Sequence, residues 1–72
     1  MDTILHPQDW HKTDVVAALH KRGLSLRRLS VANGLTPRAL GIALHRRAPK
    51  YERIIAAAIG VDAREIWGSR YV

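Results

Sequence analysis

The sequence contains no cysteine and no phenylalanine, and its longest nearly apolar stretch runs only from Ile54 to Val61. The absence of cysteine excludes disulfides and thiolate metal ligands. It is also compatible with a protein that resides in a reducing compartment. The apolar stretch is far shorter than the ~20 residues that a membrane span needs. The opening residues MDTILHPQDW lack the apolar core of a signal peptide. We therefore expect one domain over residues 1–72, located in the cytoplasm.

Acidic residues are absent between Asp14 and Glu52, although the whole chain has 12 Lys and Arg against 6 Asp and Glu, a net charge of +6. Such one-sided charge opposes compaction by self-repulsion and is typical of proteins that bind a polyanion. Nucleic acid is the partner we expect. A membrane surface, or mere solubility, is the alternative. The basic residues of this acid-free stretch are Lys21, Arg22, Arg27, Arg28, Arg38, Arg46, Arg47 and Lys50.

Glycine, proline and capping residues divide the chain into short segments with helical periodicity, and no segment alternates apolar and polar residues as a strand does. Ser25 suits an N-cap, Pro37 the first turn of a helix, and Gly34 the left-handed position after one. The pattern predicts an all-α domain of five compact helices, with Gly68 to Val72 as a tail. The predicted helices span residues 12–22, 25–33, 37–46, 49–59 and 62–67.

The segment LRRLSVANGLTPRALGIALH, residues 26–45, has the proportions of a helix-turn-helix. Small Ser30 suits the point where two helices approach most closely, and Gly34 lets the chain reverse. Leu40 and Leu44 would then pack back onto the first helix. An ordinary αα-hairpin is the alternative. The position in the middle of the acid-free basic stretch favours a helix-turn-helix that binds double-stranded DNA.

The predicted recognition helix, residues 37–46, would enter the major groove with its N-terminal end leading. Arg38 can pair bidentately with guanine, although a phosphate contact or a solvated side chain is the alternative. Ile42 can contact a thymine methyl or pack against the next helix. Gly41 lowers helix stability by roughly 1 kcal/mol relative to alanine, a cost that close approach of DNA would explain. The base-reading candidates are Pro37, Arg38, Gly41, Ile42 and His45.

Other polar residues at the two ends of the predicted helix-turn-helix are candidates for phosphate contacts, which position a protein on DNA without reading its sequence. Some begin the helix that should cross the backbone, one starts the recognition helix, where free N–H groups favour an anion, and the rest flank its far end. A solvated charged face is the alternative for each cation. The candidates are Ser25, Arg27, Arg28, Thr36, Arg46, Arg47 and Lys50.

The remaining polar residues form no catalytic or metal-binding pattern. His6, His11, His20 and His45 do not recur at ligand spacing, and the carboxylates are placed as helix-start residues. There is no Ser-His-Asp set and no glycine-rich phosphate loop. We expect no enzyme, no metal, no cofactor and no small-molecule substrate. Because the chain lacks phenylalanine, Trp10 and Trp67 are expected in the core rather than stacked on bases.

Three strings, DWHKTDVVAALHKRGLSLRRLS, NGLTPRALGIAL and the ending IWGSRY, resemble the Ner family of small regulators from Mu-like transposable phages and their bacterial relatives. The resemblance extends from Asp9 to Tyr71. It implies a λ-repressor-like fold and repression of early phage transcription by operator binding, in a bacterial cell and at its nucleoid. It also implies that two copies bind an inverted repeat.

Two departures from the family pattern bear on these implications. The family usually has proline where this chain has Gly68, and commonly threonine and asparagine where it has Arg38 and Ile42. The operator sequence therefore does not transfer. A bacterial regulator that activates host genes, a protein-binding module of antitoxin or adaptor type, and an RNA-binding protein are the alternative functions.

Overall fold

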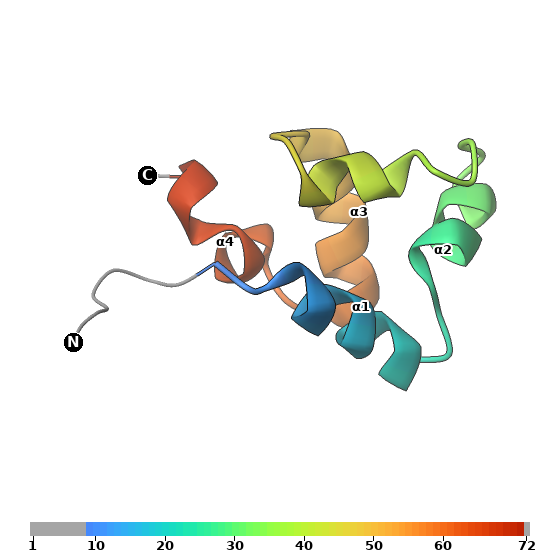
Figure 1. Ribbon diagram of the computed structural model, residues 1–72, viewed down its shortest axis with the longest axis horizontal. Helices are drawn as coiled ribbons and strands as arrows, with labels where there is room; N and C mark the ends of the chain where they lie inside the picture. Colours follow the sequence, from blue (N-terminus) through green and yellow to red (C-terminus); the bar gives the residue numbers. More distant parts are fainter. Residues whose placement is uncertain (1–8, 72) are drawn as a thin grey trace.

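The structure, a computed structural model, describes residues 9–71, which contain four α-helices, two 3-10 helices and no strand. In Figure 1, α3 runs through the middle, η1 lies across its upper end and α1 near its lower end, and α2 and α4 lie at opposite sides. No helix in this described part is long and apolar enough to cross a membrane. The elements are α1 (Lys12–Lys21), α2 (Leu26–Ala32), η1 (Leu40–Leu44), α3 (Pro49–Ile59), α4 (Ala63–Ile66) and η2 (Gly68–Tyr71).

The α-helices begin and end where local chemistry satisfies their free backbone groups. Ser25 Oγ accepts the N–H of Arg28 at 3.1 Å and caps α2, and Asp62 Oδ1 accepts the N–H of Arg64 at 2.8 Å and caps α4. Helix α3 begins at Pro49 and ends before Gly60, whose φ of +93° is left-handed. The predicted all-helical class is confirmed for the described residues, and four of the five predicted helices correspond to α1 to α4.

One hydrophobic core joins all the α-helices and η1. Leu40 and Ala43 of η1 are fully buried in it, and α3 contributes Ile55 and Ile59. Trp67 is 4% exposed, and Trp10 packs against the same core. The expectation of a core position is therefore met by the buried Trp67, whereas Trp10 is partly buried and packs against the core. The other buried apolar residues of this cluster are Val15, Leu19, Leu29, Ala56, Ala63 and Ile66.

The predicted helix over residues 37–46 is wrong, and with it the five-helix arrangement. An α-helix that began at Pro37 would bond the N–H of Leu40 to the carbonyl of Thr36, four residues back. That carbonyl instead accepts the N–H of Ala39 at 3.0 Å, three residues back, and the N–H of Leu40 bonds Ser30 Oγ at 3.1 Å. Residues 37–39 form a turn, and the chain then continues as the 3-10 helix η1.

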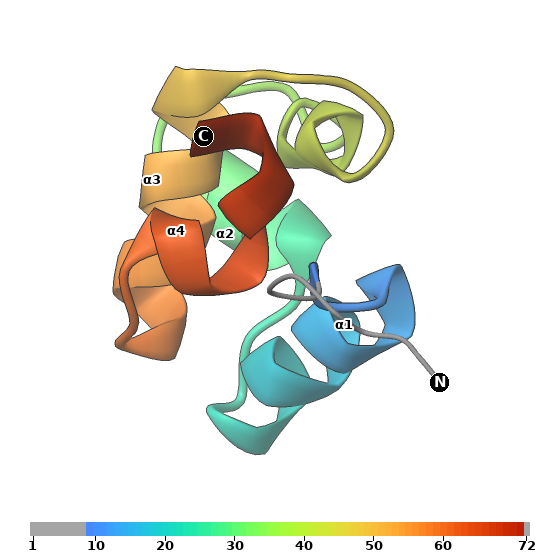
Figure 2. The same ribbon diagram turned by 90° about the vertical axis from the view of Figure 1, so that its left-hand side faces the viewer.

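The prediction of a tail after Trp67 is also wrong, because Gly68–Tyr71 forms the 3-10 helix η2. Val72 and residues 1–8, which include His6, lie outside the described residues. The carboxylate of Asp9 accepts the N–H of Ser69 at 2.9 Å and its hydroxyl at 2.6 Å. The N–H of Trp10 bonds the carbonyl of Ile66 at 2.9 Å. The two ends of the described chain therefore lie side by side (Figure 2).

Candidate nucleic-acid interface

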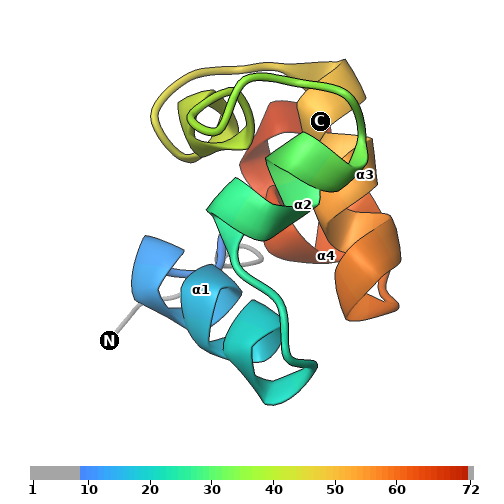
Figure 3. The ribbon, with the colours of Figure 1, turned by 90° about the vertical axis from the view of Figure 1, so that its right-hand side faces the viewer.

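Helix α2, the turn after it and η1 form the helix-turn-helix, which occupies the upper part of Figure 3. Gly34 has a φ of +72°, a left-handed conformation that reverses the chain. The N–H of Leu35 bonds the carbonyl of Ser30 at 2.9 Å and closes the turn against α2. The fully buried Ser30 side chain then holds the start of η1 through the N–H of Leu40. The second element of the motif is thus a turn followed by a 3-10 helix.

The five base-reading candidates lie on the outer side of this second element. Pro37, Arg38, Ile42 and His45 are exposed, and Gly41 is partly exposed, whereas Leu40 and Ala43 are buried on the inner side. Ile42 is 44% exposed, so part of its side chain is accessible on this outer side, while the rest is covered.

Among the described residues, no contact explains why residue 41 is a glycine. Its φ is not positive, and a Cβ placed there would meet no heavy atom within 4 Å. The local conformation and packing would therefore accept alanine. Gly41 is partly exposed and stands in the chain between the exposed Arg38 and Ile42.

A surface hollow brings the two elements of the motif together. Arg27 from the first turn of α2 lines it with Thr36, Pro37 and Arg38 from the turn before η1. Two arginines and one threonine, from both elements of the motif, therefore line a single concave surface. Such a combination of charge and shape suits a phosphate group of a nucleic-acid strand.

The other phosphate candidates lie outside this hollow. Arg46 and Arg47 follow η1 and are exposed, as is Lys50 in the first turn of α3. Glu52, the first acidic residue after the basic stretch, is fully buried. Its carboxylate is therefore not on the surface that carries these three cations.

Ser25 and Arg28 already have partners within the protein. Ser25 is partly buried, and its Oγ accepts the N–H of Arg28. The exposed Arg28 side chain folds back, and its Nη1 donates to the carbonyl of Gly23 at 3.2 Å. Arg28 would have to give up this weak contact, or share it, to reach a phosphate.

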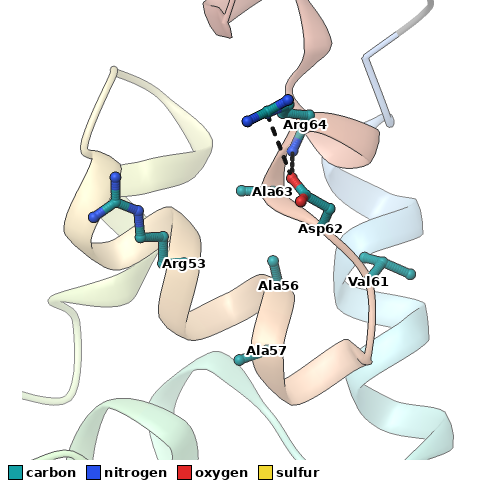
Figure 4. Close-up of a pocket in the computed structure, with 7 residues that line it drawn as sticks. All are labelled: Arg53, Ala56, Ala57, Val61, Asp62, Ala63 and Arg64. Atoms are coloured by element: carbon teal, nitrogen blue, oxygen red, sulfur yellow. Dashed lines mark hydrogen bonds and ion pairs between the residues drawn. The ribbon is translucent and has the colours of Figure 1, made fainter.

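Figure 4 shows a second concave surface, between α3 and α4. Alanines 56, 57 and 63 lie along it together with Val61, and Arg53 and Arg64 are at its borders. Its carboxylate, Asp62, caps α4 and lies 4.0 Å from Arg64 Nε. Within residues 9–71 no group of three or more His, Asp or Glu side chains could hold a metal ion.

Comparison with known proteins agrees with the helix-turn-helix geometry. Residues 9–72 match the family described as winged helix-turn-helix DNA-binding. The chain is 50% identical over 64 residues to the negative regulator of transcription of Escherichia phage D108, covering 89% of this chain and 88% of the relative. It is 49% identical over 63 residues to sugar fermentation stimulation protein B of Escherichia coli K12, covering 88% and 68%. The solution structure of the Mu Ner protein matches with a TM-score of 0.77 and 50% identity, over 89% of this chain and 86% of that one.

The chain belongs to the Ner family. The family predicted from the sequence is confirmed, and with it a DNA-binding regulator of transcription. The family description names a winged helix-turn-helix. Residues 9–71 of this Ner-family chain contain no strand, so a wing built of strands is absent from the described part. In the described part, the motif that characterises the family is therefore α2, the turn and η1.

Two structural features beside the candidate interface of this Ner-family protein were not predicted from the sequence. The first is the pair of hydrogen bonds made by the Ser30 hydroxyl, because the sequence predicted only that this side chain is small enough for two helices to approach closely. The second is the pair of the buried Glu52 and the partly buried Arg70, whose Oε2 and Nη1 atoms are 2.9 Å apart. No periodicity connects residues so far apart in the chain. The available signals were an isolated acid beside a basic stretch and an arginine within the IWGSRY ending.

Proposed function

We propose that this protein represses transcription by binding a specific double-stranded DNA operator through η1 and the turn before it. The observation that carries the proposal is the outward face of the helix-turn-helix, where Arg38, Ile42 and His45 are exposed while the nearby carboxylate of Glu52 is buried. Repression, rather than DNA binding alone, is supported by the names of the relatives from phages D108 and Mu, both negative regulators of transcription. No enzymatic step, cofactor or small-molecule substrate is needed for this function.

In this proposal, the outer side of η1 faces the base edges of the major groove. Arg38 donates to guanine, Ile42 contacts a thymine methyl, and Gly41 permits close approach of the backbone; Pro37 and His45 lie beside them at the groove. Cations at both ends of η1 contact the phosphates of the two strands. The residues proposed for phosphate contacts are Ser25, Arg27 and Arg28 at the start of α2, Thr36 before η1, and Arg46, Arg47 and Lys50 after η1.

One chain of this size covers about one half-site, so we propose that two copies bind an inverted repeat. The proposed arrangement is that of λ-repressor-like domains, with one η1 in each of two successive major grooves. The protein would act at the nucleoid in the cytoplasm of a bacterial host. Because Arg38 and Ile42 replace the threonine and asparagine that are common in the family, we propose that this chain recognises an operator sequence different from those of its relatives.

Selection of bound duplexes from a random library tests the proposal. We expect an inverted repeat whose half-sites are about 10 base pairs apart, centre to centre. The selected duplex should bind with a log affinity that falls by about 0.9 per phosphate contact against log salt. Equal affinity for every duplex at 150 mM salt would contradict sequence-specific regulation. RNA that displaced the selected duplex, or a protein partner retained in place of DNA, would contradict it as well.

A second candidate, activation of a host promoter, is favoured by the identity of 49% with sugar fermentation stimulation protein B. A reporter gene driven by a promoter that overlaps the selected site separates the two. Repression predicts that reporter output falls when the protein is expressed. A rise in output that requires the intact site would favour activation.

A further inference from the structure

The Glu52–Arg70 pair joins the C-terminal end of the described chain to the segment that follows η1. Arg70 lies in η2, and its Nη1 donates to the carbonyl of Ala43 at 2.8 Å and to that of Arg46 at 3.0 Å. The same nitrogen donates to Glu52 Oε2 at 2.9 Å. The two N–H bonds of this nitrogen are therefore shared among the carbonyl of Ala43 in η1, the carbonyl of Arg46 after η1, and one buried carboxylate.

Glu52 completes the connection from the other side. Its Oε2 also accepts the N–H of Ala48 at 2.8 Å, just before α3 begins. The segment 43–48 is thus held at three backbone positions: the carbonyls of Ala43 and Arg46 and the N–H of Ala48. Figure 2 shows η2 lying next to the connection between η1 and α3.

The surroundings of Glu52 and Arg70 restrict the movement of both side chains. The Glu52 side chain is fully buried and the Arg70 side chain is 19% exposed. The Arg70 guanidinium also lies 5.5 Å from the centre of the buried Trp67 ring. Removal of one partner from a buried pair leaves the other charge uncompensated, so the two side chains depend on each other.

We infer that Arg70, together with Glu52, is a positioning pair for DNA binding, because it sets the path of segment 43–48 and so the place where Arg46 and Arg47 meet the DNA backbone. Neither Glu52 nor Arg70 needs to touch DNA itself. The inference rests on the proposed function, in which Arg46 and Arg47 contact phosphates. It assigns a role in DNA binding to the IWGSRY ending, which lies outside the helix-turn-helix.

The experiment measures operator affinity and its salt dependence for R70Q in two backgrounds, the natural chain and the R46A/R47A variant. In the natural chain we expect R70Q to lower affinity on the order of tenfold, with a log–log salt slope reduced by about 0.9 for each phosphate that is no longer neutralised. In the R46A/R47A background R70Q should change affinity by less than twofold, since the side chains that Arg70 positions are already absent. The matched control is R64Q, which removes the same charge from a side chain that is 77% exposed and lies 4.0 Å from Asp62. R64Q should bind as the natural chain does.

Circular dichroism at the assay temperature confirms that each variant is folded. If R70Q is not folded, R70K is measured in the same two backgrounds by the same criteria. It keeps a charge opposite Glu52 but replaces the planar guanidinium by a compact ammonium group.

An equal reduction of affinity in both backgrounds, or no reduction in the natural chain, would overturn the positioning role. If instead R46A/R47A itself leaves affinity and salt slope unchanged, the phosphate contacts of the proposed function are wrong and the inference falls with them. If R46A/R47A weakens binding but R70Q has no effect in the natural chain, the positioning role is rejected while the phosphate contacts of the proposed function stand.

Discussion

Ser30 and Leu40 are joined by a buried hydrogen bond in which the serine hydroxyl oxygen accepts the leucine backbone N–H at 3.1 Å. The same hydroxyl donates to the carbonyl of Leu26 at 2.8 Å, and Ser30 is fully buried. One side chain therefore links a turn of α2 to the start of η1. The bond replaces the one that Leu40 would make in an α-helix, so it both interrupts the helical pattern and fixes η1 against α2.

Replacing Ser30 with alanine should lower the free energy of unfolding by about 1–3 kcal/mol, because a buried N–H loses its acceptor. Urea denaturation followed by circular dichroism measures the change. Ser25→Ala, which removes an N-cap at a less buried position, is the comparison and should cost about 1 kcal/mol. A Ser30→Ala variant as stable as the natural chain would show that the Leu40 N–H finds another partner.

Arg38→Ala should relax sequence preference at one base position of the operator and weaken binding by about 1–3 kcal/mol. Arg27→Ala, which alters the same surface hollow from α2, should weaken all duplexes alike and reduce the salt slope by about 1. Competition between the selected duplex and single-base variants of it measures both effects. Identical behaviour of the two variants would mean that the assignment of base reading to Arg38 and phosphate contact to Arg27 is wrong.

Gly41→Ala should leave stability unchanged or raise it by up to about 1 kcal/mol, because alanine restricts the unfolded chain and has open space in the folded one. Operator affinity should fall, since the new methyl group lies where DNA is proposed to approach. Gly34→Ala is the matched control: it also has open space, but its φ of +72° makes alanine strained, and it should be destabilised by about 1 kcal/mol. Undiminished DNA affinity in folded Gly41→Ala would argue against close approach at this position.

Ile42→Ala should weaken operator binding by about 0.5–1 kcal/mol, because it removes an apolar contact with a thymine methyl group. The stability cost should be small, because the side chain is already 44% exposed. Affinity is compared for the selected duplex and for a duplex with deoxyuridine in place of each thymidine. The natural chain should respond to removal of one methyl group and Ile42→Ala should not; an equal response of both proteins would place the contact elsewhere.

Most of the α-helical fold could be predicted because its boundaries depend on local chemistry. Ser25, Pro49 and Gly60 act within a turn of their own position, and α3 spans the residues predicted for it. The outward orientation of Arg38 and Ile42 also followed from the pattern of apolar residues. Leu40 is buried as predicted, and Leu44 is partly buried against the core. What these side chains bind on DNA stays a prediction.

The sequence by itself determined the basic, acid-free stretch, the placement of α1 to α4 and the membership of the Ner family, since each depends on residue identity or near-neighbour spacing. Only the tertiary structure decided that residues 37–46 form a turn and a 3-10 helix, because the bond that redirects Leu40 comes from Ser30 on another helix. It likewise decided that Gly68–Tyr71 is part of the fold, because Arg70 finds its acceptors on Glu52, Ala43 and Arg46. Hydrogen bonds between distant segments form only after the core has brought those segments together, and no local pattern along the chain specifies them.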